Sequence, residues 1–227
     1  MHVEDYSFSI INILKEGLRR SEGVKWTFNI ALSILFMIQV TIAIMLVLIT
    51  PELIDYLNLI ITIITLPIIV GLTILGINRA REIEIKASDI FNYLGKTPYL
   101  IGGYIAVTII TAIGFLLLIL PGIYLSVAYT FTLPLIADKN LGVWEAMELS
   151  RKTITKQWFR FFGLALTALL FILVSAIPLG IGLIWSVPAV YITYGLLYHH
   201  LFDEDVQETF VDNADKEEKT SSPDIYI

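Results

Sequence analysis

Long runs of apolar residues, separated by short polar segments, dominate the pattern of this sequence. The first run extends from Trp26 to Ile49 and the second from Leu57 to Ile77, and neither contains a charged residue. A helix of about 20 apolar residues is long enough to cross the roughly 30 Å hydrocarbon core of a bilayer. Because Pro51, Glu52 and Asp55 separate the two runs, the pattern predicts two membrane helices joined by a short polar turn.

The two later apolar runs are each too long for one membrane helix. Residues 99–137 and 161–201 would measure about 60 Å as single helices, twice the thickness of the hydrocarbon core. Proline removes a backbone donor and ends helices, so we expect outer-side turns at Pro121-Gly122 and at Pro178-Leu179-Gly180. The predicted spans are residues 26–49, 57–77, 99–120, 123–137, 161–177 and 183–201. They form three helical hairpins of an all-α polytopic membrane protein.

A short amphipathic segment with basic residues precedes each predicted hairpin. Within Ser9–Arg20, Ser88–Leu94 and Val143–Thr155, apolar residues recur at helical spacing and polar residues occupy the other face. Each segment is too short or too charged to cross a bilayer, so we expect a cytoplasmic amphipathic helix lying along the interface. The second helix of each hairpin contains one proline (Pro67, Pro134 and Pro188). The chain therefore reads as three copies of one architectural unit.

Composition and the placement of basic residues agree with this arrangement. The 227 residues are 56% hydrophobic and 16% charged, with a mean hydropathy of +0.77, whereas soluble domains average about 25% charged residues. All 15 Lys and Arg residues lie before the first hairpin, between hairpins or after the last hairpin. The positive-inside rule places those segments, and both termini, in the cytoplasm. The absence of cysteine suits a prokaryotic envelope protein, so we expect a multi-pass protein of a prokaryotic cytoplasmic membrane.

The net charge of −6 comes from the carboxyl-terminal segment. Nine acidic residues and two lysines fall within residues 203–227, and the rest of the chain is close to neutral. A segment with this charge and few apolar residues cannot bury enough surface to offset its ordering entropy. We predict a membrane domain over residues 1–202 and a disordered acidic cytoplasmic tail over residues 203–227.

Three short motifs in the middle of the chain point to a known family. They are Leu-Pro-Gly-Ile at residues 120–123, Pro-Leu-Ile-Ala-Asp at residues 134–138 and Trp-Glu-Ala-Met-Glu-Leu-Ser at residues 144–150. In this order they resemble the membrane domain attached to some glycerophosphodiester phosphodiesterases and stand-alone prokaryotic relatives of unknown function. The resemblance covers residues 85–175 and implies the helical membrane architecture. The phosphodiesterase catalytic domain has no counterpart in this sequence, so its activity is not expected.

Few residues suggest chemistry. No ionisable residue lies between the ends of the predicted spans, which disfavours a transporter coupled through membrane carboxylates. No H-E-x-x-H, P-loop or G-x-S-x-G pattern occurs. We therefore expect no catalytic, cofactor-binding or metal-binding residues, no cofactor and no enzymatic activity. His199 and His200 precede Asp203 and Glu204 at helical spacing, which is compatible with interfacial anchoring or with a metal ligand or pH sensor.

Two groups of residues are candidate contacts. Basic residues on the amphipathic segments (Arg19, Arg20, Arg151 and Lys152) would attract anionic lipid headgroups. Polar residues on the proline-containing helices (Tyr129, Thr130, Tyr191 and Tyr194) could line a polar cleft, or bond to backbone and neighbouring helices as polar groups in bundles do.

Two functions fit these observations. The first is a non-enzymatic scaffold, regulator or assembly module, which contacts membrane lipids and a protein partner through its amphipathic helices or acidic tail and does not bind nucleic acid. The alternative is a permease or lipid-handling protein with a cleft among the proline-containing helices. The absence of charges within the predicted spans favours the first.

Overall fold

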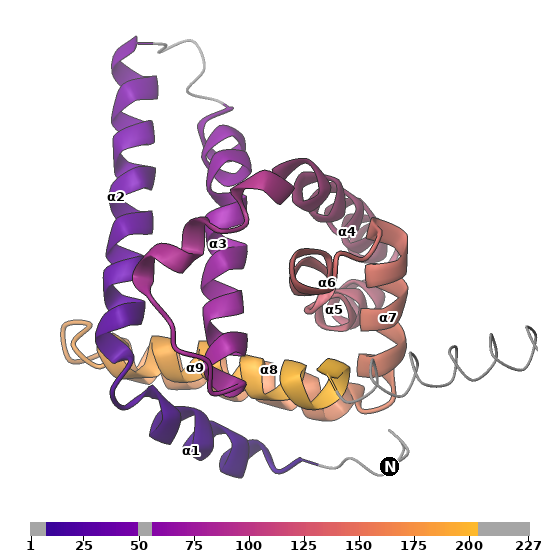
Figure 1. Ribbon diagram of the computed structural model, residues 1–227. Helices are drawn as coiled ribbons and strands as arrows, with labels where there is room; N and C mark the ends of the chain where they lie inside the picture. The colour runs from indigo at the N-terminus through magenta and orange to yellow at the C-terminus, as the bar shows by residue number, and fades with distance from the viewer. Residues whose placement is uncertain (1–7, 50–55, 204–227) are drawn as a thin grey trace, which may run out of the picture.

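The computed structural model describes residues 8–49 and 56–203, and within these residues the chain is helical and has no strand (Figure 1). The all-α class predicted from sequence is therefore confirmed. Residues 204–227, predicted to be disordered, lie outside the described residues.

The helices are grouped in chain order by the three predicted units to which they correspond. The first unit contains α1 (Ile10–Ser21), α2 (Lys25–Ile49) and α3 (Leu57–Ala80). The second contains two 3-10 turns, η3 (Ala87–Phe91) and η4 (Leu94–Lys96), and then α4 (Thr97–Leu117), α5 (Ile119–Ala128) and α6 (Thr132–Lys139). The third contains α7 (Val143–Thr155), α8 (Trp158–Ala176), α9 (Leu183–Tyr198) and a π-helical turn (His199–Asp203).

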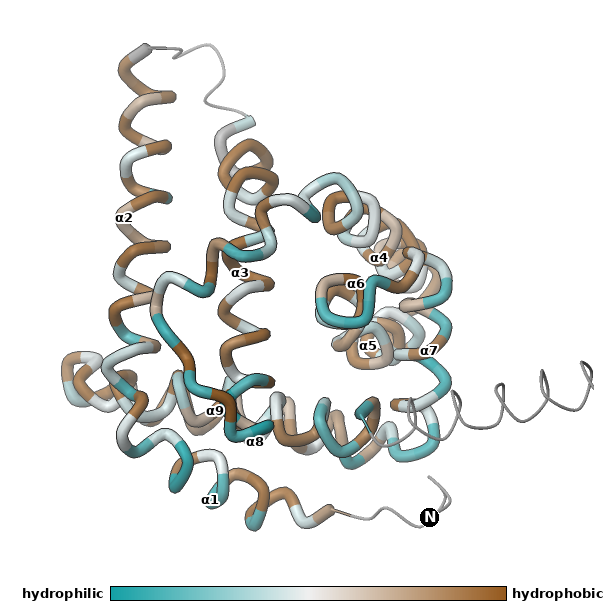
Figure 2. The backbone as a smooth tube through the Cα atoms, viewed as in Figure 1, coloured by the Kyte–Doolittle hydropathy of each residue, from teal (hydrophilic) through white to brown (hydrophobic). Residues whose placement is uncertain are grey.

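Five segments of the described chain are long and apolar enough to cross a membrane. They are Lys25–Leu48, Leu59–Ala80, Ala87–Leu117, Ile119–Lys139 and Trp158–Ala176. Figure 2 shows hydrophobic residues along α2 and α3, with hydrophilic residues on α1, on α7 and in the connecting segments. The chain is thus a membrane protein by the length and composition of its helices. The sixth predicted span, 183–201, corresponds to α9, which has only 16 residues.

The second amphipathic segment differs from its prediction. Residues 88–94 do not form an α-helix, because η3 and η4 are separate 3-10 turns. The side chain of Asp89 accepts a hydrogen bond from the Lys86 backbone N–H at 2.8 Å and fixes the first turn. The backbone of Ile90 then lies directly on α3, where a Cβ atom on Gly71 would come within 2.3 Å of the Ile90 carbonyl oxygen.

The turn of the second hairpin comes earlier than predicted. Leu118 has extended backbone angles between α4 and α5, while Pro121 and Gly122 lie in the first turn of α5. Proline is tolerated there because the first-turn N–H groups have no intrahelical partner. Gly122 allows close helix packing, since a Cβ atom at this position would lie 2.3 Å from the ring of Phe115. The predicted turn between α8 and α9, by contrast, does include Leu179 and Gly180, both with positive φ.

The predicted span 123–137 is interrupted, because α5 ends at Ala128 and α6 begins at Thr132. Pro134 cannot donate a hydrogen bond and its ring clashes with the carbonyl four residues earlier, so the helix breaks just before it. Ser150 of α7 forms hydrogen bonds with backbone groups on both sides of the break. Its hydroxyl donates to the Ala128 carbonyl at 2.8 Å and accepts from the Phe131 N–H at 3.3 Å. The serine of the third sequence motif therefore satisfies the backbone exposed by the proline of the second motif.

Helix α9 crosses α3 at a pair of glycines. A Cβ atom on Gly76 would lie 2.4 Å from the Tyr191 carbonyl oxygen, and one on Gly195 would lie 2.3 Å from the Gly76 carbonyl oxygen. Such distances leave no room for side chains, so the two backbones touch. In Figure 1, α2 and α3 run up the view while α8 and α9 run across it. The third hairpin therefore does not lie parallel to the first.

The amino-terminal end of α9 lies against the first turns of α2. Asn29 donates its side-chain N–H to the Ile184 carbonyl oxygen at 3.0 Å. That carbonyl would normally bond to the N–H four residues later, where Pro188 has none. The Lys25 ammonium also lies 5.1 Å from the centre of the Trp185 ring. A polar residue of α2 thus replaces the hydrogen bond that proline removes from α9.

Candidate functional site: a charge cluster at the ends of three helices

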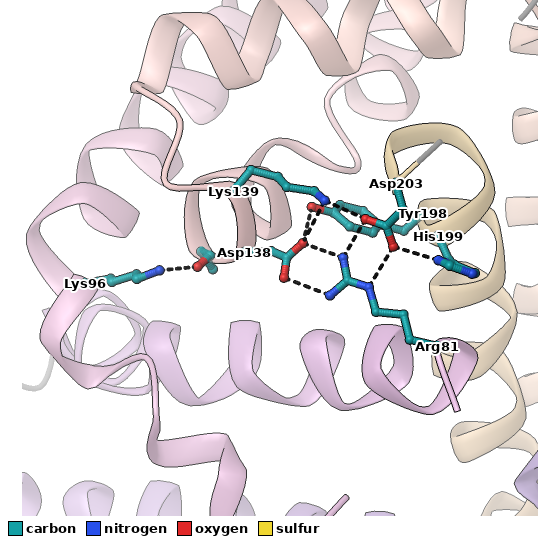
Figure 3. A network of polar contacts seen from close by, with 8 residues as sticks. Arg81, Lys96, Asp138, Lys139, Tyr198, His199 and Asp203 are labelled. Carbon is teal, nitrogen blue, oxygen red and sulfur yellow. Dashed lines mark hydrogen bonds and ion pairs between the residues drawn. The ribbon is translucent and has the colours of Figure 1, made fainter. Parts of the chain in front are cut away.

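A cluster of charged residues forms around Arg81, the residue that follows α3 (Figure 3). Its guanidinium group donates to both carboxylate oxygens of Asp138, at 2.9 and 2.7 Å. It also donates to both carboxylate oxygens of Asp203, through two bonds of 2.7 Å. Asp138 lies near the end of α6 and Asp203 ends the π-helical turn after α9. One arginine therefore links the second helices of all three units.

Four further side chains complete the cluster. The Lys139 ammonium donates to Asp203 at 2.5 Å, and the Tyr198 hydroxyl donates to Asp138 at 3.0 Å. His199 places Nδ1 2.6 Å from an Asp203 carboxylate oxygen. Lys96 donates to the carbonyl oxygen of the residue before Asp138. Each carboxylate of the cluster thus accepts hydrogen bonds from at least two side chains.

Four side chains at the centre of the cluster are largely shielded from solvent. The side chains of Arg81, Asp138, Lys139 and Asp203 are 14–21% exposed. Among these four, two basic side chains pair with two acidic ones, which matters because an unpaired charge in such a position is costly. Burial opposes ionisation of Asp203, but hydrogen bonds from Arg81, Lys139 and His199 outweigh it and hold the pKa of Asp203 below its ordinary value. Asp203 is therefore ionised at neutral pH.

No pattern in the sequence predicted this cluster. Asp203 was assigned to the acidic tail, and that boundary is wrong because its carboxylate is bound by Arg81 and Lys139. The positions of three of its residues in the sequence could have indicated the cluster. Arg81, Asp138 and Asp203 each lie just after the end of the second predicted membrane helix of a unit. The Pro-Leu-Ile-Ala-Asp motif contains Asp138, but the family resemblance that the motif supports implies no role for this residue.

A groove lies beside the cluster, between α1 and the ends of α3 and α9. It has a volume of about 570 Å³ and is lined by Ile13, Glu16, Arg20, Ala80, Arg81, Glu82, Leu196, His199 and His200. Arg20 and Arg79 form hydrogen bonds between the ends of α1 and α3. Arg20 donates to the Ala80 carbonyl at 3.0 Å, and Arg79 donates to the Arg20 carbonyl at 3.0 Å. Each thus satisfies a carbonyl at the carboxyl-terminal end of the other's helix.

The four residues predicted to contact anionic lipid lie on two helices and carry ion pairs. On α1, Arg19 and Arg20 both bond to Glu16, at 2.7 and 2.6 Å. Those hydrogen bonds lower the pKa of Glu16 to about 2. On α7, Arg151 and Lys152 both approach Glu148, at 2.8 and 3.3 Å. On each helix, one glutamate carboxylate thus offsets part of the basic charge. Contact of these residues with anionic lipid stays a prediction.

The four residues of the predicted polar cleft occupy two places. Tyr129 and Thr130 lie at the break between α5 and α6, and the Thr130 hydroxyl donates to the Val127 carbonyl at 2.8 Å. On α9, the Tyr191 ring stacks on Phe28 and the Tyr194 ring packs edge-on against Phe131. These contacts agree with the packing interpretation, and the cleft stays a prediction.

The two histidines have different surroundings. His199 belongs to the charge cluster, while both His199 and His200 line the groove beside α1. Within residues 8–49 and 56–203, no group of three or more His, Cys, Asp or Glu side chains is arranged to hold a metal ion. Comparison with known protein families, with curated proteins and with solved structures finds no match to this chain.

Proposed function

We propose that this chain is a non-enzymatic membrane scaffold or assembly module of a prokaryotic cytoplasmic membrane. The charge cluster carries the proposal, because it joins the ends of the second helices of all three units at a single place. Its carboxylates and cations are engaged with one another, as in a structural clamp. The basic residues at the same ends of the hairpins favour a cytoplasmic position for the cluster and for both termini.

The outward face of α7 is the proposed contact surface for a protein partner. Its opposite face packs on the bundle through Ala146, Met147, Ser150, Thr153 and Ile154. Trp144 is 73% exposed, and its neighbour in sequence, Glu145, is also exposed. Tryptophan is enriched among the residues that dominate the binding energy of protein interfaces.

The alternative of a permease or lipid-handling protein is supported by one observation, the interruption of the α5–α6 span at residues 129–131. Transporters place substrate sites at interrupted membrane helices. In this chain Ser150 already occupies the freed backbone groups, so the scaffold is the better supported function.

A photo-crosslinking residue in place of Trp144 tests the choice in membranes of the native host. A scaffold should give a discrete protein adduct at this position and none from Phe159, an exposed apolar residue of α8 that serves as the matched control. Adducts with lipid alone at position 144, together with lipid movement in proteoliposomes of the purified chain, would favour the alternative.

A further inference from the structure

The position of α9 relative to the first hairpin bears on how the third hairpin meets the membrane. The hairpin of α2 and α3 is the longest in the described chain, with helices of 25 and 24 residues. At 1.5 Å per residue each is about 37 Å long, enough to cross the hydrocarbon core and reach both surfaces. Because a hairpin returns to the side it left, the start of α2 and the end of α3 lie at the same surface.

Both ends of α9 lie at that same surface. Its first turn contacts the first turns of α2, through Ile184 with Asn29 and Trp185 with Lys25. The turn that follows it contacts the residue after α3, through Asp203 with Arg81. A helix that crossed the bilayer would have only one end there.

The intervening contacts agree with a helix that runs across the hairpin. The backbones of α3 and α9 touch at Gly76 and Gly195, in the last turns of α3. On its other side α9 carries the amphipathic helix α1, where a Cβ atom on Gly17 would lie 2.7 Å from the Ala189 carbonyl oxygen. Figure 1 shows α8 and α9 running across the lower ends of α2 and α3, with their connecting turn beyond the base of α2.

The turn between α8 and α9 has the composition of a segment immersed in acyl chains. No side chain from Ala176 to Ile184 can form a hydrogen bond, and Leu179 at its apex is 96% exposed. Large exposed apolar patches are unusual on surfaces that face water. Further exposed apolar residues line α8: Phe159, Leu166, Leu169, Leu170, Leu173 and Val174.

Most backbone N–H groups of this turn have internal partners, which a hydrocarbon environment requires. Backbone hydrogen bonds within the turn are made by the N–H groups of Ile177, Leu179, Gly180, Ile181, Leu183, Ile184 and Trp185. Pro178 has no N–H group to satisfy.

We propose that α8 and α9 form a hairpin that lies in the plane of the membrane within one leaflet, with its turn and the exposed face of α8 covered by lipid acyl chains. The leaflet is the cytoplasmic one, which rests on the cytoplasmic position proposed above for the charge cluster. The chain then crosses the bilayer with α2 and α3, while its third unit forms an apolar platform at their cytoplasmic ends, with α1 packed on the platform.

The test uses cysteine pairs, which is practical because the natural chain contains no cysteine. Lys25→Cys with Trp185→Cys should be joined by a short bifunctional thiol reagent in native membranes. Tyr56→Cys with Trp185→Cys is the matched control, since Tyr56 precedes α3 at the far end of the first hairpin. A hairpin that crosses the membrane beside α2 and α3 would join the second pair and not the first, which would overturn the proposal.

Single cysteines then test how deep the turn between α8 and α9 lies in the membrane and what covers it. In sealed spheroplasts, an impermeant maleimide should label Tyr56→Cys, and should label Glu22→Cys only after the membrane is opened. Leu179→Cys should stay at the background of the cysteine-free chain from both sides until SDS is added. Labelling of Leu179→Cys from outside would overturn the in-plane placement. A disulfide between two copies at this position would overturn lipid as the occupant. Glu22→Cys could instead be labelled in sealed spheroplasts and Tyr56→Cys only after the membrane is opened. If Leu179→Cys then still stays unlabelled, the proposed orientation is wrong and the in-plane placement stands.

Discussion

Two kinds of ion pair occur in this protein, and their surroundings differ. The pairs on α1 and α7 join residues three or four positions apart on exposed helices, such as Glu16 with Arg19, whose side chain is 74% exposed. The cluster around Arg81 joins residues 57 and 122 positions apart in the chain and is largely shielded from water. Water screens the first kind and weakens it, whereas the second kind must be complete because a shielded charge without a partner is costly. Similar side chains therefore have local effects in one region and hold the fold together in the other.

Removal of Arg81 should show the largest difference in stability between the shielded cluster and the exposed ion pairs. Arg81→Met leaves Asp138 and Asp203 close together and short of a positive charge, so it should lower the free energy of unfolding by about 3 kcal/mol. Thermal unfolding in detergent micelles would measure the change. Arg19→Gln is the control and should unfold at the temperature of the natural chain. Equal effects of the two substitutions would show that shielding does not distinguish the regions.

Acidification should weaken the cluster through Asp203. The pKa of this carboxyl is lowered in the folded protein, because the hydrogen bonds from Arg81, Lys139 and His199 outweigh the effect of burial. Its contribution is complete above the unfolded pKa of about 4 and is lost as the pH falls toward the folded pKa. Stability should thus decline below about pH 4. Asp203→Asn should lower stability at pH 7 by about 2 kcal/mol and reduce the acid-dependent decline. An unchanged pH profile in the variant would contradict this assignment.

Loss of the uncharged, buried hydrogen bonds of Ser150 should have an intermediate effect on stability. Ser150→Ala removes the partner of both the Ala128 carbonyl and the Phe131 N–H, and leaving these groups unsatisfied costs about 1–2 kcal/mol. Ser126→Ala is the matched control, since this more exposed serine bonds only to a carbonyl in its own helix. Hydrogen exchange at residues 128–132 should increase in the first variant only. No difference between the two would show that the break is held by other contacts.

The smallest effect is expected from the exposed pairs. Glu16→Gln breaks the ion pairs to Arg19 and Arg20, and screening limits the loss of stability to about 0.5 kcal/mol. The same substitution removes the negative charge beside two of the predicted lipid contacts, so the purified variant should retain more anionic lipid than the natural chain. Mass spectrometry of co-purified lipid measures this, and a lower anionic content would count against headgroup binding by α1.

The hydrophobic pattern was sufficient to predict the all-α class and the membrane-length helices. Uncharged runs of about 20 residues have few stable alternatives to a membrane helix, because backbone groups in lipid must be satisfied within the helix. Pro121-Gly122 located the turn between α4 and α5 to within a few residues. The break before Pro134 was not predicted, because residues 123–137 were expected to form one span. The amphipathic pattern predicted the helices α1 and α7, but the second amphipathic segment forms two 3-10 turns.

Only the tertiary structure decided which charges meet and which way α9 runs. Arg81, Asp138 and Asp203 each stand alone at a helix end, and no local pattern indicates that they share one set of hydrogen bonds. The sequence of α9 is apolar on all faces, so it carries no periodicity that would select a neighbour or a direction. Its path depends on the close contact of Gly76 with Gly195 and on the hydrogen bond from Asn29 to Ile184. Both join distant parts of the chain, where packing and hydrogen-bond geometry decide and hydropathy does not.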